Sequence, residues 1–146
     1  MTRRQKTVSK VLELKGFTRE QLQSEVKECW EAYQYEKEKL DTLESELSTH
    51  LEEFRQKQDR GTVGIREMDL FYTYFQHLER HVQQQKECVH IRRKHLDTKL
   101  EAMHEAYKEQ RLMEILRDKI VCSEVRATMH REQKETDYQF LARRTK

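Results

Sequence analysis

Apolar residues recur in the first part of the chain at alternating intervals of three and four. Over residues 8–54 they fall on two interleaved series of seven positions each. The first series is Leu12, Arg19, Val26, Tyr33, Leu40, Leu47 and Phe54, and the second is Val8, Lys15, Leu22, Cys29, Glu36, Leu43 and His50. Ten of these fourteen residues are apolar. Heptad spacing of this kind predicts an α-helix that packs one stripe, here called the seam, against a neighbouring helix.

A second apolar series follows in the other half of the chain. Its members are Phe71, Phe75, Leu78, Val82 and Val89, then Leu96, Leu100, Met103 and Tyr107, and finally Met113, Leu116 and Ile120. The group that begins at Leu96 continues the series after one extra residue. An inserted position of this kind predicts a stutter, at which the supercoil of the two helices relaxes locally.

Two of the three glycines, Gly61 and Gly64, lie between the two series. Glycine readily ends a helix, and a connection this short makes the flanking helices antiparallel neighbours. We therefore expect an all-α fold, a two-helix antiparallel coiled-coil hairpin with a longer second helix, forming one domain over 1–146. The expected boundaries are helix 1 at about 4–59, a turn at 60–64 and helix 2 at about 65–141. Facing residues then have numbers that sum to roughly 125, so that Phe54 faces Phe71, Leu47 faces Leu78, and Leu22 lies near Met103.

The remaining glycine, Gly16, allows two interpretations. Thr18 and Gln21 fit a capping box, flanked by Phe17 and Leu22 as a hydrophobic staple, so a short first helix could meet the main one at a hinge. Alternatively, Gly16 is tolerated inside one continuous helix at a cost of about 1 kcal/mol.

Composition supports long helices over a compact globular domain. Charged residues make up 38% of the chain and hydrophobic ones 35%, which leaves too little apolar material for a three-dimensional core. Proline is absent, as uninterrupted helices require. Residues 20–53 hold three Lys or Arg against eleven Asp or Glu, a net charge of −8, whereas 72–105 hold six against five, a net of +1. Unlike charges beside the seam favour pairing of these two segments.

The sequence contains no constellation that indicates catalysis. His77 and His81 are one helical turn apart, with His50 roughly opposite, but the glutamate of a zinc-protease motif is misplaced. We interpret these histidines as solvated positions beside the seam and expect no metal and no cofactor. A hairpin offers no pocket for a nucleophile, so we expect no enzyme. The cysteines, Cys29, Cys88 and Cys122, are expected to be reduced thiols of a cytoplasmic protein. The isoelectric point near 8.4 is below the range typical of nucleic-acid binding, which we also do not expect.

Two groups of apolar residues exceed what a two-helix seam can bury. Near the turn, Leu51, Leu70, Tyr72 and Tyr74 are additional, and Leu70, Tyr74, His77 and His81 form a second stripe. This surplus favours a surface for a further protein, although bulky aromatic residues that wrap around the end of the seam would give the same pattern. Beyond about residue 123 the second helix has no intramolecular partner, yet it carries Val125, Met129, Tyr138, Phe140 and Leu141. Protein binding is the function that these patterns favour.

Three segments of the chain resemble the FliJ family of the bacterial flagellar type III export apparatus. They are the early Lys10-Val-Leu-Glu-Leu-Lys15, the run from Tyr72 to Gln85 beyond the turn Gly61-Thr-Val-Gly-Ile65, and the tail from Lys134 to Arg144. The resemblance covers nearly the whole chain.

The resemblance implies a non-enzymatic stalk and escort component for flagellum biogenesis, cytoplasmic and peripherally associated with the inner-membrane export apparatus. The implied partners are a hexameric export ATPase, the cytoplasmic domain of an export gate membrane protein, and substrate-specific export chaperones. The residues implied at the ATPase ring end are Arg3, Arg4, Val8, Tyr138, Phe140, Leu141, Arg143 and Arg144. Those implied at the gate-facing tip are Leu47, Leu51, Tyr74, Leu78 and His81. The alternatives are the stalk of a virulence-type secretion ATPase and a self-associating structural coiled-coil tether.

Overall fold

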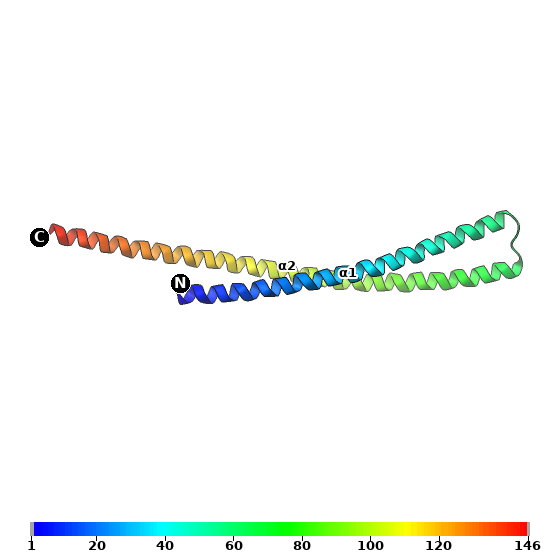
Figure 1. Ribbon diagram of the computed structural model, residues 1–146, viewed down its shortest axis with the longest axis horizontal. Helices are drawn as coiled ribbons and strands as arrows, with labels where there is room; N and C mark the ends of the chain where they lie inside the picture. The colour runs from blue at the N-terminus through cyan, green and yellow to red at the C-terminus, as the bar shows by residue number, and fades with distance from the viewer. Residues whose placement is uncertain (1, 146) are drawn as a thin grey trace. The chain divides into compact units, whose positions relative to one another are not determined.

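The computed structural model describes residues 2–145, which form two α-helices joined by a short turn (Figure 1). Helix α1 spans Arg3–Asp59 and helix α2 spans Ile65–Arg144. The helices pack against each other as a hairpin, and no β-strand occurs in the part of the chain that the structure describes. With 80 residues against 57, α2 is the longer helix. The expected all-α helical hairpin is therefore confirmed.

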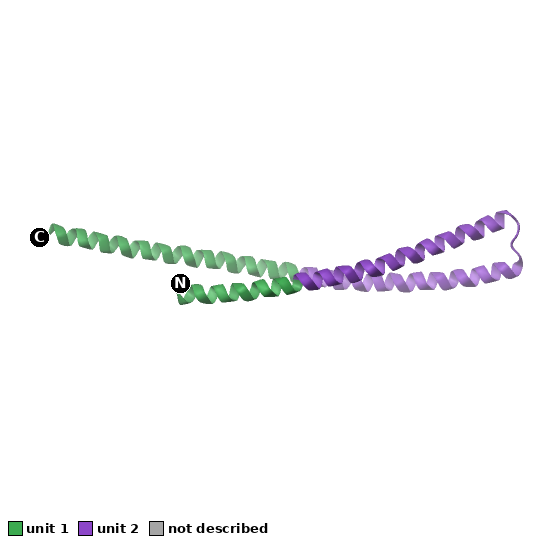
Figure 2. Cartoon of the chain, in the orientation of Figure 1, with its two compact units in different colours: residues 1–22, 102–146 green, residues 23–101 purple. Residues whose placement is uncertain are grey.

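The chain divides into two compact units (Figure 2). Unit 1 comprises Met1–Leu22 and Ala102–Lys146, and unit 2 comprises Gln23–Glu101. In each unit a segment of α1 lies beside a segment of α2. That residues 1–146 behave as one domain stays a prediction.

Burial along α1 follows the heptad series expected from its sequence. All fourteen expected seam residues are at least partly shielded from solvent: Val8 is buried and the other thirteen are half-buried. Polar members such as Lys15, Glu36 and His50 share this shielding because the spacing, and not the residue type, places them against α2.

Burial along α2 also follows the four-three spacing, and the predicted stutter is wrong. Shielded residues recur at positions 71, 75, 78, 82, 85, 89, 96, 99, 103, 106, 110, 113, 117, 120 and 124, with exposed Arg92 at the position that would complete the series. Leu100, Ala102 and Glu114, which flank this series, are also half-buried. Gln85, Lys99 and Ala106 occupy seam positions, although none of them is large and apolar. The spacing of large apolar residues therefore does not reveal these positions. Tyr107 and Leu116, both expected in the series, lie beside the seam and are exposed.

Side-chain contacts between the helices confirm the expected register. The rings of Phe54 and Phe71 have centroids 4.7 Å apart, and Phe75 completes an aromatic cluster with them. In the same register the Lys99 ammonium lies 2.9 Å from a Glu25 carboxylate oxygen in unit 2. In unit 1, Lys15 and Glu109 make the equivalent contact at 2.7 Å, again with residue numbers that sum to 124. The facing of Leu47 with Leu78, and of Leu22 with Met103, stays a prediction.

The turn is built around Gly61, which has a φ of +66°. Its N–H donates to the Gln58 carbonyl at 3.0 Å, and the Thr62 N–H donates to the Lys57 carbonyl at 3.3 Å. This pair of bonds is the Schellman arrangement, which satisfies the last carbonyls of a helix and needs a left-handed residue at this position. The Gly64 carbonyl then accepts from the Met68 N–H at 3.0 Å and so begins α2.

The hinge interpretation of Gly16 is wrong, because α1 runs through this residue as continuous helix. Thr18 does not cap a new helix: its hydroxyl donates back to the Leu14 carbonyl at 3.1 Å, as helix-interior threonines do. A Cβ on Gly16 would lie 3.9 Å from Nε2 of Gln110, which is an ordinary contact distance. Neither backbone conformation nor packing therefore requires glycine here.

Replacing Gly16 with alanine should stabilise the protein by about 0.5–1 kcal/mol, because alanine has the higher helix propensity and fits without strain. The measurement is urea unfolding followed by helical circular dichroism. The matched control is Gly61→Ala, which should destabilise by about 1–2 kcal/mol because alanine is strained in the left-handed region. A loss of stability in Gly16→Ala would contradict the continuous helix.

The ion pair between Lys99 and Glu25 gives stability a dependence on alkaline pH. The hydrogen bond that Lys99 donates to the Glu25 carboxylate, followed by the negative charge of Glu25, raises the pKa of Lys99 above the ordinary 10.5. A folded-state pKa above the unfolded one contributes stability that is fully present below the unfolded pKa and is lost as pH rises through the folded value.

The melting temperature of the native chain should therefore fall between about pH 10 and pH 12 more steeply than that of Glu25→Gln, in which the cause of the raised Lys99 pKa is removed. Lys94→Met removes an exposed lysine and should keep the native slope. Thermal melts at one-unit pH intervals provide the measurement. Parallel slopes for the native chain and Glu25→Gln would show that the pair is not formed in solution.

Candidate partner-binding surfaces

Exposed apolar residues gather around the turn in unit 2. We call this group the tip surface. It comprises Leu51, Ile65, Met68, Leu70, Tyr72 and Tyr74, of which Ile65 is 83% exposed and Leu70 71%. Phe71 and Phe75, by contrast, are half-buried against Phe54. The aromatic residues thus do wrap the end of the seam, as one interpretation expected, but they leave the tip surface uncovered.

The five residues expected at the gate-facing tip differ in their exposure. Leu51, Tyr74 and His81 are exposed, Leu47 is half-buried, and Leu78 is only 6% exposed because it belongs to the seam. The Tyr74 hydroxyl lies 3.3 Å from Nε2 of His50, which holds this side chain against α1. Three of the five residues are therefore accessible to a partner, whereas Leu78 is buried in the seam.

Sequence reasoning missed Ile65 and Met68 as members of the tip surface. Both lie in the first turn of α2, directly after the glycine turn. Ile65 and Met68 are three residues apart and precede the series that begins at Phe71. This helical spacing was the signal that could have identified them.

Aromatic and cationic side chains alternate on unit 2 farther from the turn. The Arg93 guanidinium lies 5.6 Å from the centroid of the Tyr33 ring, and Lys39 lies 4.4 Å from that of Tyr35. Trp30 and Tyr35 are exposed beside them. Sequence reasoning also missed Trp30 and Tyr35, because neither of these two residues occupies a seam position, whereas Tyr33 does.

The second candidate surface, which we call the tail surface, is the end of α2 in unit 1. Residues 125–145 are all exposed, and Figure 1 shows that no other helix lies beside this stretch. The Thr2 hydroxyl and the Glu124 carboxylate, 2.5 Å apart, join α1 to α2 just before it. The tail surface carries Val125, Met129, Tyr138, Phe140 and Leu141, as the sequence indicated. A lone helix is marginally stable in water, so this stretch is suited to ordering against a partner.

Most residues expected at the ATPase ring end are accessible. Those exposed are Arg3, Arg4, Tyr138, Phe140, Leu141, Arg143 and Arg144, whereas Val8 is buried at 8% exposure. Val8 is a seam residue that holds the start of α1 against α2. The accessible members combine large apolar side chains with four arginines.

Just before the tail surface, α2 carries apolar residues on more than one face, between charged ones. Met113 and Ile120 face the seam, while Leu112 and Val121 are exposed on other faces. A two-helix seam buries one stripe of each helix, so Leu112 and Val121 stay in contact with water. Leu14 and Phe17 on α1 are exposed in the same unit. Unit 1 thus has more apolar surface than its own two helices cover.

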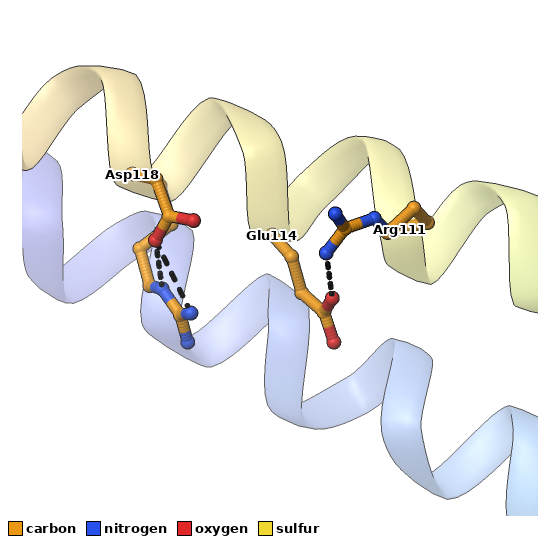
Figure 3. Close-up of polar contacts among 4 residues, drawn as sticks. Arg111, Glu114 and Asp118 are labelled. Atoms are coloured by element: carbon orange, nitrogen blue, oxygen red, sulfur yellow. Dashed lines mark hydrogen bonds and ion pairs between the residues drawn. The ribbon is translucent and has the colours of Figure 1, made fainter.

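Charged residues between these apolar positions are paired within α2. The Arg111 guanidinium lies 3.2 Å from a Glu114 carboxylate oxygen, and that of Arg117 lies 3.3 Å from an Asp118 oxygen. Figure 3 shows Arg111 directed toward Glu114, with Asp118 farther along α2. Exposed pairs such as these contribute at most about 1 kcal/mol each and neutralise their own charge locally. The five Lys or Arg against one Glu in residues 1–15, and the ten against seven acids in residues 106–146, leave unit 1 basic. This excess charge favours a partner with an acidic surface.

The fold and the two apolar surfaces together define the chain as a helical hairpin with apolar side chains exposed near the turn and near the end of α2. The sequence matches the family described as flagellar FliJ protein over residues 5–144, nearly the whole chain, and the chain therefore belongs to the FliJ family. Its members are non-catalytic components associated with flagellar protein export. Comparison with curated proteins and with solved structures gave no match. Within the described residues, neither helix has a segment long and apolar enough to cross a membrane.

Proposed function

We propose that the protein acts as the stalk of the flagellar export ATPase, with the tail surface docked in a hexameric ATPase ring. The observation that carries this proposal is the exposed end of α2. Tyr138, Phe140 and Leu141 lie there, in a stretch of the helix that no other described segment covers. Docking would bury these side chains and order the stretch at the same time. The protein hydrolyses nothing itself; it favours ring assembly and nucleotide turnover by binding.

The charge of unit 1 supports the same docking. Arg3, Arg4, Arg143 and Arg144 are all exposed. A basic end approaching an acidic ring lumen associates faster, since electrostatic complementarity acts mainly on the rate of encounter. The apolar side chains then supply most of the affinity.

The tip surface is proposed to bind the cytoplasmic domain of the export gate, and the exposed faces of the hairpin to escort export chaperones. Leu51 and Tyr74 are the accessible anchors on this surface, one from each helix. Because the tip and tail surfaces belong to different units, one chain offers separate sites to the two partners. The protein would then reside in the cytoplasm, peripherally associated with the inner-membrane export apparatus.

The combined variant Tyr138→Ala, Phe140→Ala and Leu141→Ala tests the ring docking. It should lower stimulation of the cognate export ATPase at least tenfold, because the three side chains are the apolar anchors of the tail surface. Helical circular dichroism should change little, since all three are exposed. Steady-state ATP hydrolysis with increasing amounts of the protein provides the measurement.

The matched control is Leu51→Ala with Tyr74→Ala. This pair should leave ATPase stimulation at the native level and weaken binding of the gate domain at least tenfold in a titration. Stimulation that survives the tail variant unchanged would refute the docking assignment. Self-association of the native chain in sedimentation experiments, reversed by either variant and without any effect on the ATPase, would favour a structural tether instead.

A further inference from the structure

On α2 in unit 2, the Nε2 atoms of two histidines lie close together. Nε2 of His81 lies 3.2 Å from Nε2 of His77, and the ring centroids are 4.6 Å apart. The residues are four positions apart, so their side chains leave the same face of the helix. Both are exposed, so the two nitrogens are accessible to solutes.

This contact brings two potential metal ligands together. Neutral imidazole nitrogens are common ligands of transition metals. Each ring can bind a metal ion through Nε2 while its hydrogen lies on Nδ1.

From this geometry we propose that His77 and His81 bind a divalent transition-metal ion of the borderline class, such as Ni²⁺, Zn²⁺ or Cu²⁺. Nitrogen–metal bonds of about 2.0–2.1 Å to atoms 3.2 Å apart subtend an angle of roughly 100° at the ion. That angle lies between the square and tetrahedral values. Hard cations such as Mg²⁺ and Ca²⁺ are not expected here because they require oxygen ligands.

The site has two protein ligands, and water completes the coordination. His50, the third ligand considered from the sequence, contacts Tyr74 and lies 3.6 Å from a Glu53 carboxylate oxygen. Across residues 2–145 no group of three or more His, Cys, Asp or Glu side chains comes together in a metal-binding arrangement. Binding is therefore reversible and weaker than at a four-ligand structural zinc site.

Metal binding would have a structural consequence for α2. The ion links two successive turns of the helix close to the tip surface and binds only the folded form with this geometry. A ligand that binds the native state alone raises the melting temperature, and the rise continues with the logarithm of the free ligand concentration once that exceeds the dissociation constant. The site thus provides a readout of stability that is independent of the partners proposed above.

The test is a calorimetric titration of the full-length protein with Ni²⁺. The native chain should bind with a stoichiometry of one at this site, and His77→Ala and His81→Ala should each weaken that affinity at least tenfold. Ni²⁺ should raise the melting temperature of the native chain but not of either variant. Both residues are exposed, so circular dichroism should confirm that the variants fold normally.

The matched control is the double variant His90→Ala with His95→Ala. These histidines are also exposed on α2, but five residues of helix separate them by about 140° around the axis, so they do not converge. This variant should bind Ni²⁺ as the native chain does, and the thiols are unchanged in every variant. Equal affinity of His77→Ala and the native chain, or loss of binding in the His90 and His95 control, would overturn the proposal.

Discussion

Every feature of this protein depends on one seam, in which side chains spaced four and three residues apart on α1 pack against the same spacing on α2. Two helices can enclose very little. The buried apolar residues are Val8, Leu78, Val82, Leu96, Ala106 and Ile120, and the remaining seam positions are half-buried except that of Arg92, which is exposed. Stability therefore comes from repetition of a modest contact along the helices. An uninterrupted spacing on both helices is the condition for that repetition.

Polar residues within the seam have a different role from the apolar ones. Gln85 donates to the Glu36 carboxylate at 2.6 Å, and also to its backbone carbonyl at 2.8 Å. Together with the pair of Lys99 and Glu25, this contact is possible in one register only. Interhelical polar pairs of this kind add little net stability but exclude slipped alignments, which an apolar seam would tolerate. The register in turn determines which residues reach the surface at the turn.

The seam leaves apolar side chains uncovered on both helices. The contact between the two helices buries a single stripe of each. Apolar side chains elsewhere, such as Leu70 near the turn and Phe140 near the end of α2, therefore stay in contact with water. Such exposure is unfavourable for an isolated chain and is relieved by partners. Membership of the FliJ family associates the protein with flagellar protein export.

The sequence alone determined the hairpin, the whole seam of α1 and the contact of Phe54 with Phe71, because periodicity reports which face of a helix is shielded. It did not determine the seam of α2, where Gln85, Lys99 and Ala106 lack the apolar bulk that a periodicity search detects. Whether such a residue is shielded depends on the side chains of the helix that packs against it. For the same reason Val8 and Leu78, expected at partner-binding surfaces, are buried. Only the tertiary structure showed that the Thr18 hydroxyl donates to a carbonyl within a continuous helix. A capping sequence acts as a cap only where a helix begins.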